Sequence, residues 1–367
     1  MTLTTPLRMA SREPGTMRRM GSFALALLSA SSCVVAVAAC GASARDRDVP
    51  LPAASAPDAA ALAAIAPLAP MIGGTWWTSF PSGRRQAERW HRGPGGSSLR
   101  VDSHGDASGE RTCGVVRVFY WHAAEQRLRL RAFLRGGRII EGPVQRDGDG
   151  VLAETVLAAP GAADRALVWQ WTQEAADDAR LRLAEGDARA RVPMTDWRAH
   201  RVASEEVRDP TIVDGSPLLP PALQVFMPMV GPRWQALRGD EVVRTTRFRV
   251  VPFAEIVHVC TTSGAGDEGE LEAELFVYVA PRGALVQALL LLADGSVGEG
   301  AVTTLPGGVV RLELQCHGPR GAGSFQVELE VRDGSLRQRV VNVGGATSAI
   351  ADRSWDFLSP SMAAAGD

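Results

Sequence analysis

Hydrophobic and polar residues alternate with a period of two in many short segments of the chain. Between residues 271 and 279, Leu271, Ala273 and Leu275 alternate with glutamates. Such alternation places successive side chains on opposite faces of an extended strand, so it predicts a half-buried β-strand. Further strands are predicted at residues 127–134, 151–157, 166–172, 242–250, 309–315, 325–331 and 336–343.

Turn-forming residues separate these segments. Asp294-Gly295 and Asp333-Gly334 stand between predicted strands, and Asp-Gly pairs supply the positive φ angles that tight hairpins need. Many short strands joined by hairpins, without long helical patterns, predict antiparallel meanders. A meander of about eight to ten strands removes its exposed edges by closing into a barrel. We therefore predict an all-β fold, preceded by a short helix over residues 59–68.

One motif occurs twice in the chain. Pro70-Met71-x-Gly73-x-x-Trp76 recurs as Pro228-Met229-x-Gly231-x-x-Trp234, a shift of 158 residues (234 − 76). Without any gap, the same shift pairs Tyr120 with Tyr278, Glu141-Gly142 with Glu299-Gly300, and Trp197 with Trp355. Self-similarity at a fixed period indicates a duplicated structural unit. We therefore expect one barrel to be present twice.

The residues that follow the first motif resemble a known family of barrels. Met71-Ile72-Gly73-Gly74-Thr75-Trp76 looks like the first strand of calycin-type barrels. It is followed by Glu88-Arg89-Trp90, Gly95-Gly96-Ser97, Phe119-Tyr120 and Phe133-x-x-Gly136-Gly137-x-x-x-Glu141-Gly142. This layout resembles bacterial lipocalin-like domains of uncharacterised function, over residues 71–197 and, through the repeat, 229–355. The resemblance implies short, often exported, up-and-down barrels.

The same resemblance assigns roles to the repeated tryptophans. In lipocalin-like domains the opening tryptophan fills the barrel floor, so Trp76 and Trp234 are predicted to be structural. We interpret Trp197 and Trp355 as core residues of closing strands. A haem-binding relative carries alternating glycines after the opening tryptophan, whereas Trp77-Thr78-Ser79 follows it here. The resemblance therefore implies no cofactor.

These observations predict two tandem antiparallel up-and-down lipocalin-like barrels of about 8–10 strands each. Barrel 1 is predicted at residues 65–203 and barrel 2 at residues 222–360, joined by a linker at 204–221. Residues 1–40 form a signal region, and residues 361–367 a tail. Residues 41–64 are rich in Ala, Pro, Ser and Asp, which is typical of a flexible tether.

The N-terminal region predicts export. Arg18-Arg19 precede an apolar run over residues 23–39, as in a secretory signal. The run ends in Val37-Ala38-Ala39-Cys40, which resembles a bacterial lipobox, in which the cysteine is acylated. Acyl chains anchor a protein to a bilayer, so we predict a lipoprotein of the cell envelope that is tethered at Cys40. The alternative is cleavage after Ala42-Ser43-Ala44, which would give a secreted or periplasmic protein.

Composition and motifs exclude several classes of function. The net charge of −2 and the lack of a basic block argue against a nucleic-acid-binding protein. The chain contains no lysine, so lysine-based Schiff-base and P-loop chemistry are excluded. It also contains no Gly-x-Ser-x-Gly elbow and no His-Glu-x-x-His motif. No catalytic residue and no enzymatic activity are therefore predicted.

The remaining histidines, cysteines and glutamates are scattered. The six histidines form no metal-binding motif, so no metal site is predicted. His258, inside an apolar strand, is expected to be a surface or hydrogen-bonded strand histidine. A disulfide between Cys260 and Cys316 stays open for an exported protein, and it would leave Cys113 unpaired. In an up-and-down barrel, however, the strands of Cys260 and Cys316 are not expected to be neighbours. Acidic pairs such as Glu272 and Glu274 are expected on a solvated outer face.

Two repeated arginines are the best candidates for contacts with a ligand. Arg89 and Arg247 are each followed by an aromatic residue, Trp90 and Phe248. An arginine that points into a barrel can bind an anionic group, or it can stack on the opening tryptophan as a structural element. The residues predicted to bind a ligand are Arg89, Trp90, Tyr120, Arg247, Phe248 and Tyr278.

The expected function is binding. A small barrel can hold one small ligand, so we expect a membrane-tethered lipoprotein that binds a small apolar or amphipathic molecule. The alternative is a structural or protein-interaction module of the cell envelope with filled barrels. A cavity in either barrel favours the first interpretation, and a fully packed interior favours the second.

Overall fold

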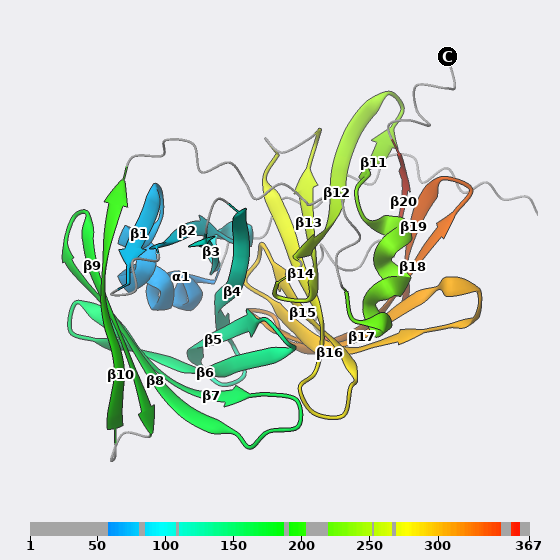
Figure 1. Ribbon diagram of the computed structural model, residues 1–367. Helices are drawn as coiled ribbons and strands as arrows, with labels where there is room; N and C mark the ends of the chain where they lie inside the picture. The colour runs from blue at the N-terminus through cyan, green and yellow to red at the C-terminus, as the bar shows by residue number, and fades with distance from the viewer. Residues whose placement is uncertain are drawn as a thin grey trace, which may run out of the picture. The chain divides into compact units, whose positions relative to one another are not determined.

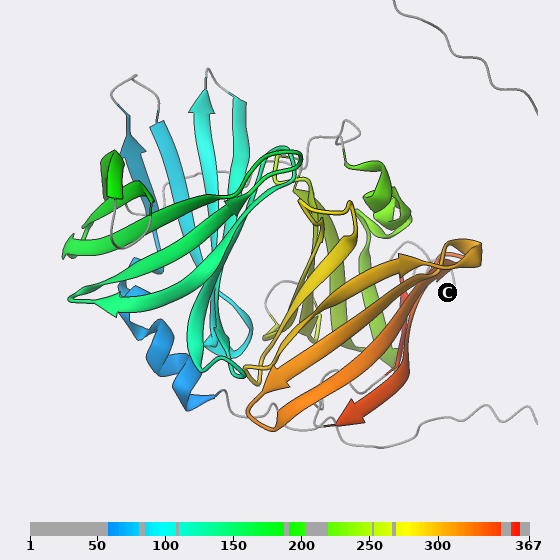
Figure 2. The same cartoon turned by 90° about the horizontal axis from the view of Figure 1, so that it is seen from below.

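The chain folds into two closed antiparallel barrels of ten strands each, β1–β10 and β11–β20 (Figure 1). Figure 2 shows the same barrels from below. This computed structural model describes residues 58–80, 85–107, 110–186, 191–202, 219–251, 253–265, 269–345 and 354–359. The all-β class and the tandem pair of barrels are thus confirmed. Both barrels belong to one compact unit, residues 51–367.

Barrel 1 is preceded by a short helix. Helix α1 (Ala59–Ile65) begins where the Asp58 carboxylate accepts a hydrogen bond from the Ala60 N–H, and a 3-10 segment, η1 (Ala66–Met71), follows it. Ile65 and Leu68 insert into the core of barrel 1. The strands are β1 (Thr75–Ser79), β2 (Arg85–Arg92), β3 (Ser98–Ala107), β4 (Glu110–His122), β5 (Arg127–Leu134), β6 (Arg138–Asp147), β7 (Gly150–Ala158), β8 (Arg165–Ala175), β9 (Asp178–Gly186) and β10 (Arg191–Val202), with η2 (Pro94–Gly96) before β3.

Barrel 2 repeats this arrangement. The 3-10 segment η3 (Pro221–Met229) inserts Leu223 and Phe226 into its core, as η1 does in barrel 1. The strands are β11 (Arg233–Arg238), β12 (Glu241–Val251), β13 (Ile256–Ser263), β14 (Leu271–Val279), β15 (Val286–Leu292), β16 (Val297–Thr304), β17 (Val310–Gly318), β18 (Gly321–Arg332), β19 (Ser335–Gly345) and β20 (Trp355–Leu358), with η5 (Pro306–Gly308) before β17.

The repeated motif lies where the chain enters each barrel, and we call its Trp–Met hydrogen bond (Trp76 to Met71, Trp234 to Met229) the latch. The motif glycine has a positive φ, 87° in the first copy and 103° in the second, which turns the chain into the first strand. The indole of Trp76 then points back and donates a hydrogen bond to the Met71 carbonyl at 2.7 Å. Trp234 donates in the same way to Met229 at 2.8 Å. Both indoles are buried, so each motif joins a 3-10 segment to its barrel core.

The two copies share one register through β6 but differ beyond it. Both have a bulge in the same place, after Ser103 in β3 and after Thr261 in β13. Val156 of β7 pairs with Glu141 of β6, and Gln315 of β17 pairs with Glu299 of β16. Val156 and Gln315 are therefore equivalent in the sheets, with a shift of 159 (315 − 156). β8 and β18 correspond again with a shift of 158 (329 − 171). The expectation of a gap-free repeat is therefore wrong in β17, because the turn containing η5 is one residue longer.

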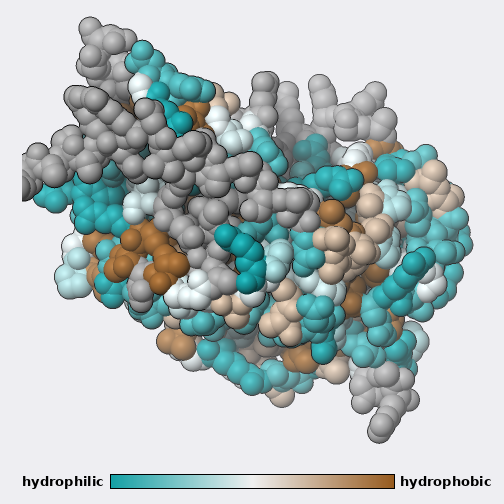
Figure 3. Space-filling view, turned by 180° about the vertical axis from the view of Figure 1, so that it is seen from behind, coloured by the Kyte–Doolittle hydropathy of each residue, from teal (hydrophilic) through white to brown (hydrophobic). Residues whose placement is uncertain are grey.

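The outer surface is mixed in character. On the face shown in Figure 3, hydrophilic side chains surround separate apolar patches. Val192 and Leu285 are the most exposed large apolar side chains of the described residues, at 67% and 64%. Among the described helices, none has the length and apolar character needed to span a bilayer.

Removal of either latch should destabilise the protein to a similar extent. Trp76→Ala and Trp234→Ala each empty a buried indole site, and we expect each to lower the free energy of unfolding by about 3–5 kcal/mol. Trp76→Phe keeps an aromatic ring but leaves the Met71 carbonyl without its donor, so a smaller loss of about 1–3 kcal/mol is expected. Urea denaturation measures all three, with Leu285→Ala as the exposed control. A loss under about 1 kcal/mol for both alanine variants would contradict the latch.

Candidate functional site

Strand alternation places the two candidate arginines outside the barrel interiors. Trp90 and Phe248 are buried in the cores of barrels 1 and 2. Adjacent residues of a strand point to opposite faces, so Arg89 and Arg247 point away from those cores. The guanidinium that stacks on Trp76 belongs to Arg201, 5.1 Å from the ring centroid.

Barrel 2 contains a cavity of about 90 Å³. Its wall is formed by side chains that point inward from strands β12 to β15 and β17 to β19. The apolar part of the wall includes Phe248, Val259, Leu275, Leu290, Leu312, Leu314, Val327 and Leu329. The polar part consists of Arg244, Thr246, Thr261 and Gln338.

Larger side chains stand at the equivalent positions of barrel 1. Val327 and Leu329 of the cavity wall correspond, with the shift of 158, to Trp169 and Trp171. The two indoles stack with centroids 5.7 Å apart, and Trp171 also meets Phe119 edge-on at 5.5 Å. Exchange of two indoles for two aliphatic side chains therefore accounts for much of the space in barrel 2.

A buried ion pair also distinguishes the interior of barrel 1. Arg117 and Glu88 pair there, with side chains only 4% and 7% exposed, and Arg117 donates a hydrogen bond to Ser103 at 3.0 Å. The shift places Leu275 and Thr246 at the positions of Arg117 and Glu88, and both line the cavity. The interior of barrel 2 is thus less polar as well as less crowded at this level.

Arg244 is the charged residue of the cavity wall. Its Nη2 lies 2.5 Å from Glu272 Oε2, and its guanidinium lies 4.3 Å from the ring centroid of Trp355. The hydroxyls of Thr246 and Thr261 are 3.1 Å apart. The cavity therefore offers a polar region whose formal charge is already compensated, beside a larger apolar region.

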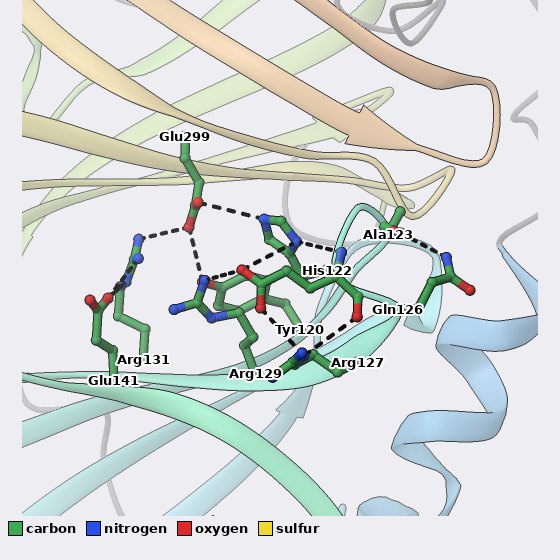
Figure 4. Close-up of polar contacts among 10 residues, drawn as sticks. Tyr120, His122, Ala123, Gln126, Arg127, Arg129, Arg131, Glu141 and Glu299 are labelled. Carbon is green, nitrogen blue, oxygen red and sulfur yellow. Dashed lines mark hydrogen bonds and ion pairs between the residues drawn. The ribbon is translucent and has the colours of Figure 1, made fainter. Parts of the chain in front are cut away.

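The two candidate tyrosines lie at the junction between the barrels, where Figure 4 shows Glu299 reaching toward Tyr120 and Arg131. The Tyr120 hydroxyl donates to Glu299 Oε1 at 3.0 Å. Arg131 pairs with Glu299 at 3.0 Å and with Glu141 at 2.8 Å, and it donates to the Tyr278 hydroxyl at 3.1 Å. Both tyrosines are therefore held by polar contacts with the opposite barrel, not inside a barrel.

An apolar core accompanies this polar network. Phe133 of barrel 1 stacks on Phe276 of barrel 2 with centroids 5.8 Å apart, and it contacts Tyr278 at 5.0 Å. The buried cluster around them draws on β4 to β6 from barrel 1 and on β13 to β16 from barrel 2. The outer faces of these strands are therefore buried around this cluster, as the inner faces are inside the barrels.

The junction joins equivalent surfaces of the two copies. Gly95 packs so closely on Ala293 that a Cβ would lie 1.9 Å from the carbonyl oxygen. At the positions shifted by 158 (253 − 95 and 293 − 135), the ring of Phe253 lies 5.8 Å from the guanidinium of Arg135. Such reciprocal contacts are the mark of a local two-fold arrangement, in which one patch meets its own copy.

A second polar cluster lies where equivalent positions meet. Arg100 and His258 are separated by the repeat shift itself (258 − 100), and Nη1 of the first lies 3.3 Å from Nε2 of the second. His258 Nε2 is also 3.1 Å from Glu274 Oε1. Glu274 is 1% exposed, so its expected place on a solvated face is wrong. The reason is that barrel 1 covers that face of β14.

The disulfide bond that export would permit between Cys260 and Cys316 can be compared with the structure. No disulfide bond joins Cys260 to Cys316. They lie on β13 and β17, which are not neighbours in the barrel. The side chain of Cys113 lies outside the described residues. The positions of β13 and β17 therefore agree with the expectation that these strands would not be neighbours, and the disulfide left open for an exported protein is not formed.

Sequence reasoning missed the junction, although one signal for it is present. Phe276 and Tyr278 share a strand face with Glu274, opposite the apolar face of Leu275 and Val277. Two aromatic residues on the supposedly solvated face indicate a strand that is buried on both sides.

Trp197 does pack against the core of barrel 1, and Trp355 against that of barrel 2.

Comparisons with known proteins add little to this geometry. No protein-family model matches the chain, and no curated protein matches it. Among solved structures, it is similar to a protein of unknown function from the DUF3598 family of Nostoc punctiforme. The two are 12% identical, with a TM-score of 0.21, and the match covers 82% of this chain and 97% of that chain. At that TM-score the likeness carries no conclusion, and the lipocalin-like assignment stays a prediction.

The junction should make stability depend on pH through Glu299. Burial opposes ionisation of Glu299, but the charge of Arg131 and the hydrogen bond from Tyr120 hold its pKa below the ordinary value of 4.5. A carboxylate with a depressed folded-state pKa stabilises the fold above its unfolded-state pKa, and this stabilisation is lost as pH falls through the folded-state pKa. Glu299→Gln should therefore flatten the loss of stability below about pH 4.5.

Urea denaturation between about pH 3 and pH 7 measures this slope. Glu241→Gln, which removes an exposed carboxylate at the start of β12, is the matched control and should keep the slope of the unsubstituted protein. An unchanged slope in Glu299→Gln would show that the junction does not depend on this charge.

Proposed function

We propose that this protein binds a small apolar or amphipathic molecule inside barrel 2. The observation that carries the proposal is the cavity of about 90 Å³, with its mainly apolar wall and the polar region at Arg244. The wall is built from residues that differ from their counterparts in barrel 1. A site specific to one copy is what is expected when two copies diverge and only one acquires a ligand.

The volume limits the class of ligand. Pockets for drug-sized molecules measure about 300–1,000 Å³, and an apolar cavity of about 150 Å³ holds benzene. A space of about 90 Å³ suits a slender group, such as a short alkyl chain, and not a large ring system. The polar end of such a molecule would lie near Thr246 and Thr261.

We propose further that the protein is exported and anchored in the cell envelope. The support is the apolar run that ends in Val37-Ala38-Ala39-Cys40, the pattern that resembles a lipobox. These residues, and residues 41–57 of the tether predicted at 41–64, lie outside the described residues. In the runner-up proposal, the protein is a structural or interaction module of the envelope. The stacked indoles of barrel 1 favour that role for barrel 1.

A larger side chain in the cavity should abolish binding. Primary alcohols of increasing chain length are the probe, and each buried methylene should add about 0.8 kcal/mol, or roughly fourfold in affinity, until the cavity is full. Ala273→Leu places three more carbons into the cavity wall, and we expect it to remove saturable binding in calorimetry. Ala301→Leu makes the same change on the exposed face of β16 and should leave binding intact. Equal affinities for all three proteins, or none for the unsubstituted protein, would refute the proposal.

Acylation at Cys40 should be visible in the mature protein. Mass spectrometry of protein from its own membrane fraction is expected to find an N-terminal Cys40 that carries acyl chains. Cys40→Ala should move the protein out of that fraction, whereas Cys33→Ala, a matched change inside the apolar run, should not. An unmodified N-terminus at Arg45 would instead establish cleavage after Ala44.

A further inference from the structure

We propose that His258, Cys260 and Glu274 form a binding site for a divalent transition-metal ion of the zinc type. Each residue offers one ligand atom, and these atoms all lie within 4.8 Å of one another. They supply nitrogen, sulfur and oxygen. That donor set suits zinc and its borderline-soft neighbours, whereas magnesium and calcium prefer oxygen alone.

The strands position the three side chains without any loop. His258 and Cys260 are two residues apart on β13 and therefore share one face. Glu274 of β14 is directly opposite Cys260 in the register. All three side chains thus project from the face of barrel 2 that meets barrel 1, on a hydrogen-bonded sheet that fixes their spacing.

The distances between the ligand atoms approach those of a tetrahedral site. With metal–ligand bonds of about 2.0–2.3 Å, tetrahedral geometry separates neighbouring ligand atoms by about 3.3–3.8 Å. His258 Nε2 is 3.4 Å from Cys260 Sγ and 3.1 Å from Glu274 Oε1. Cys260 Sγ and Glu274 Oε1 are 4.0 Å apart. Small rotations of the side chains are therefore enough to complete three of the four ligand positions.

An independent observation points to a missing partner. Glu274 Oε2 is buried and has no hydrogen-bond partner among the described residues. A buried carboxylate oxygen without a partner is costly, so such an atom is rare in a folded protein. A cation that this carboxylate binds through both of its oxygens would supply the partner. Cys260 is partly exposed, so solvent can reach the cluster from its side.

Arg100 competes with a metal ion for the Glu274 carboxylate. Its Nη1 contacts Glu274 Oε1 and lies 3.3 Å from His258 Nε2, while its Nε lies 3.2 Å from Asp102 Oδ2. A guanidinium thus already occupies the place that attracts a cation. When the metal binds, Arg100 keeps Asp102 and releases Glu274. The charges of the ion, Arg100, Asp102, Glu274 and a Cys260 thiolate then sum to zero.

Cobalt titration of the full-length protein tests the site. Co²⁺ should bind with one-to-one stoichiometry and produce the near-ultraviolet charge-transfer absorption of a cobalt–thiolate bond, and Zn²⁺ should displace it. Cys260→Ser should abolish the absorption. His258→Gln and Glu274→Gln should each weaken Zn²⁺ binding by at least about 100-fold in calorimetry, because even outer-shell changes cost 10–100-fold.

Two further variants test whether the ion binds at this cluster and how Arg100 affects it. Cys316→Ala removes the buried thiol of β17 and should keep both the absorption and the affinity. Arg100→Met removes the competing cation and should tighten Zn²⁺ binding about tenfold, since like charges repel strongly in a buried site. Absence of saturable binding, or absorption that persists in Cys260→Ser, would overturn the proposal. Weaker binding in Arg100→Met would overturn the role of Arg100.

Discussion

Burial of a second sheet face is the constraint on which the rest of this structure depends. A strand of a small barrel usually presents one face to the interior and the other to water. Here the outer faces of β4 to β6 and β13 to β16 form a common apolar core with Phe133 and Phe276. A polar group that is buried on those faces has lost water and must find a partner. The pairing of Arg131 with Glu141 and Glu299, and of Glu274 with Arg100, follows from that requirement.

The repeat takes on a physical meaning in this setting. Some shared residues serve each barrel separately, as the latch of Trp76 and Trp234 does. Others, such as Tyr120 and Tyr278, serve the contact between the copies. A patch that meets its own copy has the geometry of a symmetric dimer. Once both copies lie in one chain, positions facing each other can diverge, as Arg100 and His258 have done.

Alternation and the repeat were enough to predict the all-β class and the two tandem barrels, because these depend on local pattern and spacing. They were not enough to predict the site. Alternation shows that Glu274 and Tyr278 share a face, but it does not show what covers that face. The cavity depends on side-chain volume at Val327 and Leu329. The shift of 158 pairs these residues with Trp169 and Trp171, but it does not show whether space remains inside a barrel. The outward direction of Arg89 could have been predicted from the sequence, because the adjacent Trp90 is the residue suited to a buried core.

Strand β14 has a property that follows from its place between two buried regions. Leu275 lines the cavity of barrel 2, and Glu274, its neighbour in the chain, points the opposite way into the junction. Any displacement of the β14 backbone moves both side chains together. A shift of this strand therefore couples the interior of barrel 2 to the junction. By thermodynamic linkage, if a ligand in the cavity changes the free energy of binding at the junction, binding at the junction changes the free energy of binding in the cavity by the same amount.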